Sequence, residues 1–133
     1  MNVDHIAVAV KDLEESSGFY EKLLGSPCSG TETVIEQKVK VAFFTAGGTK
    51  IELLQPTGPD SPVAKFLETR GPGLHHICFT VDDLDAEMER LRKSGTVFID
   101  ARPRPGSHGS RVAFIHPKSS GGVLTELRET AKN

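Results

Sequence analysis

The chain has 133 residues, of which 37% are hydrophobic and 26% are charged, and its formal net charge is −2. This length suits one domain with a sizeable core, and the composition argues against intrinsic disorder. The small net charge excludes a general attraction to nucleic acid or to an acidic membrane, although a local basic cluster could still bind a phosphate. We therefore expect a single domain over residues 1–133 with neither nucleic acid nor membrane as a partner.

The sequence also predicts a cytoplasmic location. It contains no apolar run of about 18 residues, so we expect no transmembrane helix. The N-terminal region contains Asp4 and lacks a basic segment followed by an apolar one, so we expect no secretory signal peptide. Cys28 and Cys78 do not have the CxxC spacing of metal or redox motifs, and two reduced thiols are expected rather than a disulfide.

One sequence pattern occurs twice along the chain. Each copy has a histidine, a short apolar strand, an Asp-capped helix that ends near a glycine, and then further strands. The histidines are His5 and His76, and each is followed after 36 residues by a VAF segment, at Val41 and at Val112. The copies end in "TKIELLQ" and "GVLTELRE", which align Glu52 with Glu126. The chain is therefore predicted to consist of two copies of one structural unit.

The first copy spans about residues 1–56. Its strand is followed by a helix that begins at Asp12, where Glu15 completes a capping-box pattern. Gly25 is suited to the left-handed residue that ends a helix. The segment "VKVAFFTAGGTKIELL" predicts a hairpin around its Gly-Gly turn. The apolar residues of the helix would form one buried face; they are Leu13, Phe19, Tyr20, Leu23 and Leu24.

A connector of about residues 60–71 joins the two copies. Its proline and glycine residues mark turns, and Pro62 is placed to start a short helix after Asp60 or Ser61 as the cap. We expect this helix to run to about Thr69.

The second copy spans about residues 73–129. Its helix carries Leu84, Met88 and Leu91 at helical spacing and ends near Gly95. A Pro- and Gly-rich loop, "DARPRPGSHGS", precedes a looser hairpin, "SRVAFIHPKSSGGVLTEL".

The repeated histidines and glutamates predict a metal site. A lone histidine or glutamate on a strand usually has a structural or solvent-facing role. A charge on an apolar strand is costly unless it is paired or bound to a metal, and here it occurs at matched positions in both copies. Two imidazoles and two carboxylates suit a divalent metal, whereas the absence of thiolates disfavours a closed structural zinc site. The candidate ligands are His5, Glu52, His76 and Glu126.

From Val3 to Glu129 the sequence resembles the vicinal oxygen chelate superfamily. Three segments, "GLHHICFTVDDLDA", "DSPVAKFL" and "FIHPKSSGGVLTEL", resemble the methylmalonyl-CoA epimerase family within it. The resemblance implies an α+β fold in which two tandem βαβββ modules form a cupped mixed sheet around a metal, and it implies a homodimer. It implies a divalent metal, with Co²⁺ as the first expectation and Mn²⁺, Ni²⁺ or Zn²⁺ as alternatives. The ligands that it implies are again His5, Glu52, His76 and Glu126, whereas His75 matches no ligand position.

The reaction implied by the resemblance is the metal-dependent epimerisation of (R)- and (S)-methylmalonyl-CoA, which belongs to propionate metabolism. A proton would leave and return at C2 through a metal-stabilised enolate, because the metal stabilises the negative charge that develops. The catalytic acid and base implied are Glu36 and Glu126, on opposite faces of the substrate. If the carboxylate of Glu36 were buried, its pKa would be raised, which suits a base acting near pH 7.

Substrate contacts are expected in the second copy. His116, Lys118 and Ser119 are candidates for binding the substrate carboxylate or the pantetheine arm. The positive charges available to the CoA moiety are those of Arg102, Arg104, Arg111 and Lys118. No GxxxxGK[ST] motif is present, so the phosphates would not be bound by a P-loop.

Three alternative functions remain open from the sequence. A glyoxalase I-type lactoylglutathione lyase has the same fold and a comparable ligand set. An iron dioxygenase would need only two histidines and one glutamate, which leaves Glu52 unexplained. A metal-free protein that binds small molecules would need none of the four ligands.

Overall fold

The computed structural model of the protein describes residues 1–130. The chain forms two compact units. The first unit runs from His5 to His75, and the second unit combines Met1–Asp4 with the chain from His76 onward. Among the residues described, no helix is both long enough and apolar enough to cross a membrane.

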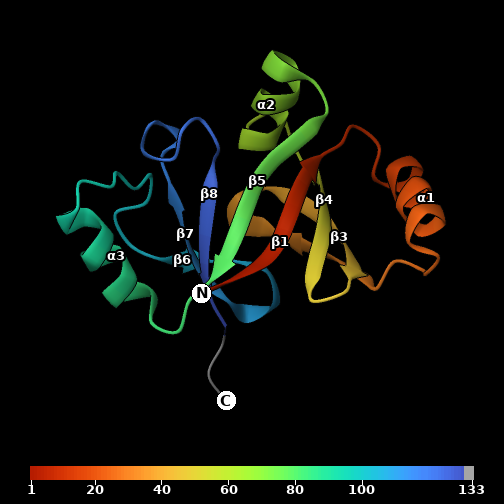
Figure 1. The fold of residues 1–133 in the computed structure, drawn as a ribbon. Helices are drawn as coiled ribbons and strands as arrows, with labels where there is room; N and C mark the ends of the chain where they lie inside the picture. The colour runs from red at the N-terminus through yellow and green to blue at the C-terminus, as the bar shows by residue number, and fades with distance from the viewer. Residues whose placement is uncertain (131–133) are drawn as a thin grey trace. The chain divides into compact units, whose positions relative to one another are not determined.

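The first unit contains one βαβββ module and the connector helix (Figure 1). Its strands are hydrogen-bonded in the order β2-β3-β4-β1, with β1 parallel to β4 and the other pairs antiparallel. The elements in chain order are β1 (Asn2–Ala9), α1 (Leu13–Leu24), β2 (Gly30–Val34), the 3₁₀ turn η1 (Ile35–Gln37), β3 (Val39–Ala46), β4 (Thr49–Pro56) and α2 (Pro62–Arg70).

The second unit repeats the module. Its strands are ordered β5-β8-β7-β6, and β5 is parallel to β8 as β1 is to β4. The predicted α+β class and the two βαβββ modules are therefore confirmed. The elements are β5 (Gly73–Thr80), α3 (Leu84–Lys93), β6 (Arg104–Pro105), the 3₁₀ turn η2 (Ser107–Gly109), β7 (Arg111–Ile115), the 3₁₀ turn η3 (Pro117–Ser119) and β8 (Thr125–Glu129).

The helix starts follow the local signals in the sequence. The Asp12 side chain accepts a hydrogen bond from the Glu15 amide at 3.1 Å, which confirms the predicted cap of α1. Asp83 accepts one from the Ala86 amide at 3.0 Å, in the same way. Ser61 caps α2, which extends one residue past the predicted end, to Arg70.

A second, long-range cap also repeats in the two units. The Gln55 side-chain oxygen accepts a hydrogen bond from the Leu13 amide at 2.8 Å, and a Glu129 oxygen accepts one from the Leu84 amide at 2.6 Å. Each acceptor lies three residues after the repeated glutamate of its module. The last strand of each module is therefore tied to the first turn of its helix.

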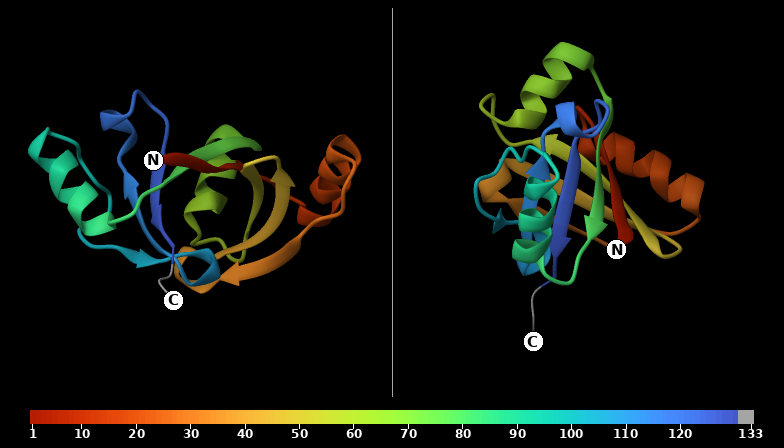
Figure 2. Two further views of the ribbon diagram at one scale, coloured as in Figure 1. Left: turned by 60° about the horizontal axis from the view of Figure 1, so that its bottom comes forward. Right: turned by 60° about the vertical axis from the view of Figure 1, so that its left-hand side comes forward.

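In the first unit the two faces of the sheet pack against different helices (Figures 1 and 2). On one face Ala7, Ala9 and Leu54 pack with Val63 and other apolar residues of α2. The other face packs against α1, through a cluster that contains Leu13, Tyr20, Leu24, Val8, Phe44 and Leu53. Because side chains alternate along a strand, His5 and Glu52 lie on the face covered by α2.

In the second unit α3 covers one face of the sheet. Leu84 and Met88 of α3 pack with Ala113, Ile115 and Leu127. By alternation along β8, Glu126 and Arg128 lie on the opposite face from Leu127. Both glutamates proposed as ligands therefore lie on the sheet face that does not pack against the helix of their own module.

We expect Glu129→Ala to lower the free energy of unfolding by about 2 kcal/mol, because a buried helix N-terminal amide loses a charged acceptor. Glu129→Gln should lower it by less than about 1 kcal/mol, because an amide oxygen can accept the same bond, as Gln55 does on α1. Urea unfolding measures both values. Equal losses in the two variants would show that the hydrogen bond to Leu84 is not what stabilises the junction.

Candidate functional site

In the first unit, His5 and Glu52 form a close buried pair. The Nδ1 atom of His5 lies 3.0 Å from Oε2 of Glu52, and the two side chains are only 3% and 5% exposed. The pair joins β1 to β4, which are neighbouring parallel strands. The sequence predicted these two residues at one site, and within this unit they are in contact.

In the second unit, His76 and Glu126 form the equivalent pair. The Nε2 atom of His76 lies 3.0 Å from Oε1 of Glu126, again with both side chains buried. The Phe114 and His76 rings are packed edge to face at 89°, with centroids 5.5 Å apart. The four predicted ligands thus occur as two buried imidazole–carboxylate pairs.

The strand register around each glutamate is the same in both units. Glu52 is paired with Ala7 on its parallel neighbour and with Phe43 on its antiparallel neighbour. Glu126 is paired with Cys78 and with Phe114. The residue beside each glutamate on the parallel strand is small and comes two positions after the histidine. The sequence repeat is therefore also a repeat of the environment of the carboxylate.

The paired residues fit a divalent metal ion. Imidazole and carboxylate are common ligands of such ions. Two neighbouring ligands of an octahedral ion, each about 2.1 Å from it, lie about 3.0 Å apart, which is the separation within each pair. The Oε2 atom of Glu52 is buried and lies 3.0 Å from Nδ1 of His5, yet among residues 1–130 it has no hydrogen-bond partner. A buried carboxylate oxygen in this state is suited to bind a cation.

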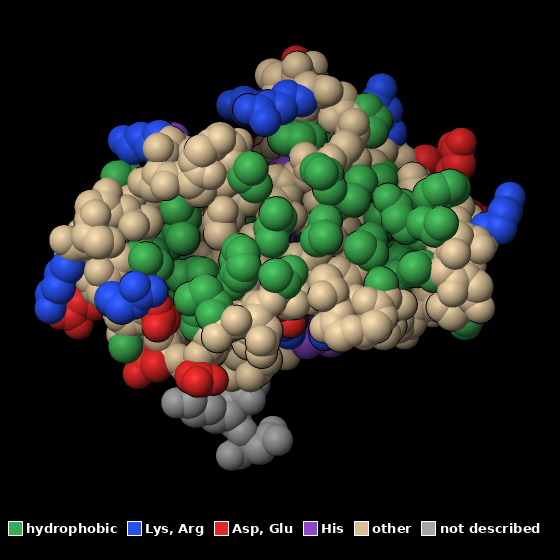
Figure 3. All heavy atoms as spheres, in the orientation of Figure 1, with side chains coloured by type: hydrophobic (Ala, Val, Ile, Leu, Met, Phe, Trp, Pro, Cys, Tyr) green, Lys and Arg blue, Asp and Glu red, His purple; other side chains and the backbone are tan. Residues whose placement is uncertain are grey.

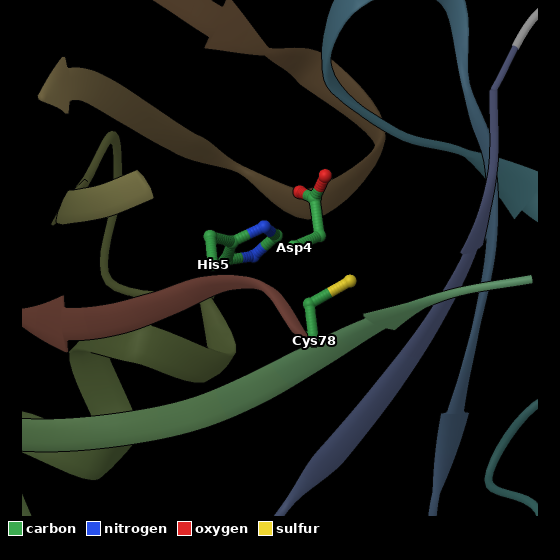
Figure 4. A group of neighbouring side chains, drawn as sticks. All are labelled: Asp4, His5 and Cys78. Carbon is green, nitrogen blue, oxygen red and sulfur yellow. The ribbon is translucent and has the colours of Figure 1, made fainter. Parts of the chain in front are cut away.

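Cys78 and Asp4 are neighbouring side chains in the second unit (Figure 4). Cys78 is fully buried and Cys28 is partly buried, and within the described residues neither forms a disulfide. Asp4 precedes His5 directly on β1, and its carboxylate contacts Arg128 and Thr80. No motif in the sequence predicts a role for the Asp4 carboxylate or for Arg128.

The predicted catalytic residue Glu36 lies in η1, between β2 and β3, and its side chain is exposed. The condition of a buried carboxylate, under which its pKa would be raised, is therefore not met in the free protein. The segment turns instead of continuing as a strand, because Lys38 takes a left-handed backbone conformation with φ of 54°. The catalytic role assigned to Glu36 remains a prediction.

The three candidates for substrate binding lie at the turn between β7 and β8 and are exposed. The Nδ1 atom of His116 accepts a hydrogen bond from the Lys118 amide at 3.1 Å. The hydroxyl oxygen of Ser119 accepts one from the Val97 amide at 2.9 Å. These bonds order the turn and leave the Lys118 side chain at the surface.

The arginines of the second unit differ in their surroundings. Arg111 forms ion pairs with Asp85 at 3.0 Å and with Glu129 at 3.5 Å, and the hydrogen bond that it donates to Asp85 raises the pKa of its guanidinium group. Arg104 contacts Asp100 and lies over the Phe114 ring, 5.0 Å from its centroid. Arg102 is exposed. Arg111 therefore supports the structure, whereas Arg104 reaches the aromatic ring that faces His76.

Comparison with known proteins agrees with this geometry. Residues 4–114 match the family model described as the Glyoxalase/Bleomycin resistance protein/Dioxygenase superfamily. The chain is 42% identical over 128 residues to the human mitochondrial methylmalonyl-CoA epimerase, covering 96% of this chain and 73% of the relative. It is 41% identical over 129 residues to the ethylmalonyl-CoA/methylmalonyl-CoA epimerase of Cereibacter sphaeroides, covering 96% of both chains.

A solved structure extends the likeness to the fold. A variant of the Streptomyces coelicolor methylmalonyl-CoA epimerase, in complex with 2-nitronate-propionyl-CoA, superposes with a TM-score of 0.91 at 40% identity. The alignment covers 98% of this chain and 95% of that one. The sequence repeat, the two βαβββ modules and these relatives lead to one assignment: the chain belongs to the glyoxalase/bleomycin resistance/dioxygenase superfamily and, within it, to the methylmalonyl-CoA epimerases.

Proposed function

We propose that the protein is an epimerase that interconverts (R)- and (S)-methylmalonyl-CoA. The observation that carries the proposal is the buried imidazole–carboxylate pair that recurs at the same register position in both units. It occurs in a chain about 40% identical to methylmalonyl-CoA epimerases over nearly its whole length. A cytoplasmic location is part of the same proposal.

We propose that His5, Glu52, His76 and Glu126 together bind one divalent ion. Nitrogen and oxygen donors suit Co²⁺, Mn²⁺, Ni²⁺ and Zn²⁺, and Co²⁺ is our first choice. The buried Glu52 oxygen that lacks a hydrogen-bond donor supports a cation at this position. When bound, the ion supplies Lewis-acid stabilisation of the negative charge that develops on the thioester oxygen of the substrate.

The protein side chains would move the proton. Inversion at C2 needs one group that removes the proton from one face and another that returns a proton to the opposite face. Glu36 and Glu126 are the two carboxylates proposed for these roles. Glu36 is exposed in the free protein, so it would work as a base only where the bound substrate displaces water from it.

The CoA portion of the substrate needs positive charge at an accessible position. Lys118 has an exposed side chain. It lies on a turn that is ordered by hydrogen bonds from backbone amides to the side chains of His116 and Ser119. Arg104 is partly exposed and lies over the Phe114 ring. We propose that these residues bind the carboxylate or the phosphates of the substrate.

We also propose that the protein is a homodimer. In the first unit, hydrophobic side chains gather over β1, β4 and α1 (Figure 3). Phe19 and Leu23 of α1 are 58% and 63% exposed, and apolar groups of this size at a surface commonly mark an interface. A molar mass of one chain by light scattering at micromolar concentration would contradict the dimer.

The direct test of function follows the C2 proton. In D₂O, methylmalonyl-CoA should exchange its C2 proton for deuterium when the protein is present, because epimerisation passes through loss of that proton. A chelator should stop the exchange, and added Co²⁺ should restore it. Mass spectrometry of the CoA ester measures the exchange. Formation of lactoylglutathione from the glutathione hemithioacetal, without this exchange, would instead support a glyoxalase.

Neighbouring histidines offer a matched test of the metal ligands. We expect His76→Ala to lose most of its bound metal, because it removes an imidazole of one pair. His75→Ala should keep it, because the His75 ring packs against Phe66 of α2, with centroids 4.9 Å apart. Each variant loses one aromatic contact, so the His75→Ala variant controls for the loss of such a contact. Equal metal content by elemental analysis would remove His76 from the ligand set.

A second matched pair tests the base. Glu36→Gln should lower the rate of epimerisation by about 100-fold or more, because an amide cannot accept the proton. It should keep the fold and the metal content. Glu14→Gln, an equally exposed change on α1, should leave the rate unchanged. A near wild-type rate for Glu36→Gln would exclude Glu36 from the mechanism.

A further inference from the structure

A buried ion pair joins Asp4, the residue before His5, to Arg128, which lies two residues after Glu126. The Nη1 atom of Arg128 donates to Oδ2 of Asp4 at 3.0 Å, across 124 residues of chain. The two side chains are 6% and 13% exposed. The Thr80 hydroxyl group lies 3.3 Å from the other oxygen of Asp4, to which it donates a hydrogen bond. The carboxylate of Asp4 is therefore held by two strands, β8 and β5.

Stability alone does not explain this pair. Removing two charges from water is costly, and apolar side chains of similar size in their place often give an equally stable protein. The Nε atom of Arg128 is also buried without a hydrogen-bond partner in the described part of the chain, which adds to the cost. A directional ion pair can instead define the position of the backbone segments that carry it.

The positions of the two residues indicate which segments these are. Asp4 immediately precedes His5 in the chain. The pairing of β1 with β4 begins only at His5, which is paired with Lys50. Arg128 lies within β8, paired with Thr80 on one side and Val112 on the other. It comes two residues after Glu126, on the same face of the strand. The ion pair thus joins the start of β1, just before His5, to the strand that carries Glu126.

We infer that Asp4 and Arg128 are positioning residues for the metal centre. Their ion pair holds the backbone at Asp4 and thereby fixes the His5 imidazole, the first residue in the β1–β4 ladder, in its ligand position. The inference rests on the proposed function only in that the four ligands must bind a metal. It predicts that breaking the pair weakens metal binding even where the fold is intact.

The test measures metal affinity, not turnover. Isothermal titration of the metal-free protein with Co²⁺ gives the Kd for the wild type, Asp4→Asn and Arg128→Met. We expect the Kd to rise about 10-fold in each variant, as for other residues that orient metal ligands. Epimerisation should fall at limiting Co²⁺ and recover at saturating Co²⁺. Asp60→Asn and Arg90→Met remove charges from exposed ion pairs and should keep the wild-type Kd.

A double variant separates positioning from stability. Asp4→Leu combined with Arg128→Met replaces the ion pair with apolar side chains, so its stability should be close to that of the wild type. Its Kd for Co²⁺ should still be about 10-fold higher, because the directional contact is lost. A wild-type Kd in this folded variant, or in both single variants, would overturn the inference and leave the proposed function intact. Failure of the wild type to bind Co²⁺ would overturn the metal centre and this inference together.

Discussion

The contact between a buried imidazole and a buried carboxylate, present once in each unit, is the constraint on which the rest of the structure depends. A carboxylate without water is stable as an anion only beside a cation or hydrogen-bond donors. Glu52 and Glu126 each have one imidazole nitrogen at 3.0 Å. The residues beside them on the parallel strands are small, Ala7 and Cys78, so no large side chain from those strands covers the carboxylates. Such a carboxylate is stabilised further by a bound metal ion.

The framework of each module follows from the strand that carries the glutamate. Side chains alternate between faces, so a residue three positions later points away from the ligand face. Gln55 and Glu129 occupy those positions, and each accepts a hydrogen bond from the first amide of its helix. One strand thus presents a proposed ligand on one face and fixes a helix on the other. This arrangement explains why the spacing from ligand to cap is the same in both copies although the hairpin lengths differ.

The parts of this structure that the sequence predicted are those specified by local or repeated signals. Asp12 and Ser61 cap helices through amides two or three residues away, and the alignment of the two copies selected the histidines and glutamates that form the two buried pairs. What the sequence could not show depends on contacts across the fold. The ion pair of Asp4 with Arg128 spans 124 residues and has no local pattern. The exposure of Glu36 was also not evident from the sequence, because it depends on the turn at Lys38.

The two copies differ where the proposed chemistry requires a difference. Inversion needs a proton acceptor on one face of the substrate and a proton donor on the other. By the repeat interval the position of Glu36 is occupied in the second copy by Ser107, whose hydroxyl group is not a base at neutral pH. The position of Arg128 is occupied in the first copy by Leu54, which packs in the core against α2. Duplication can therefore supply the symmetric part, two pairs of ligands. Later divergence would supply the asymmetric part, one base and one ion pair.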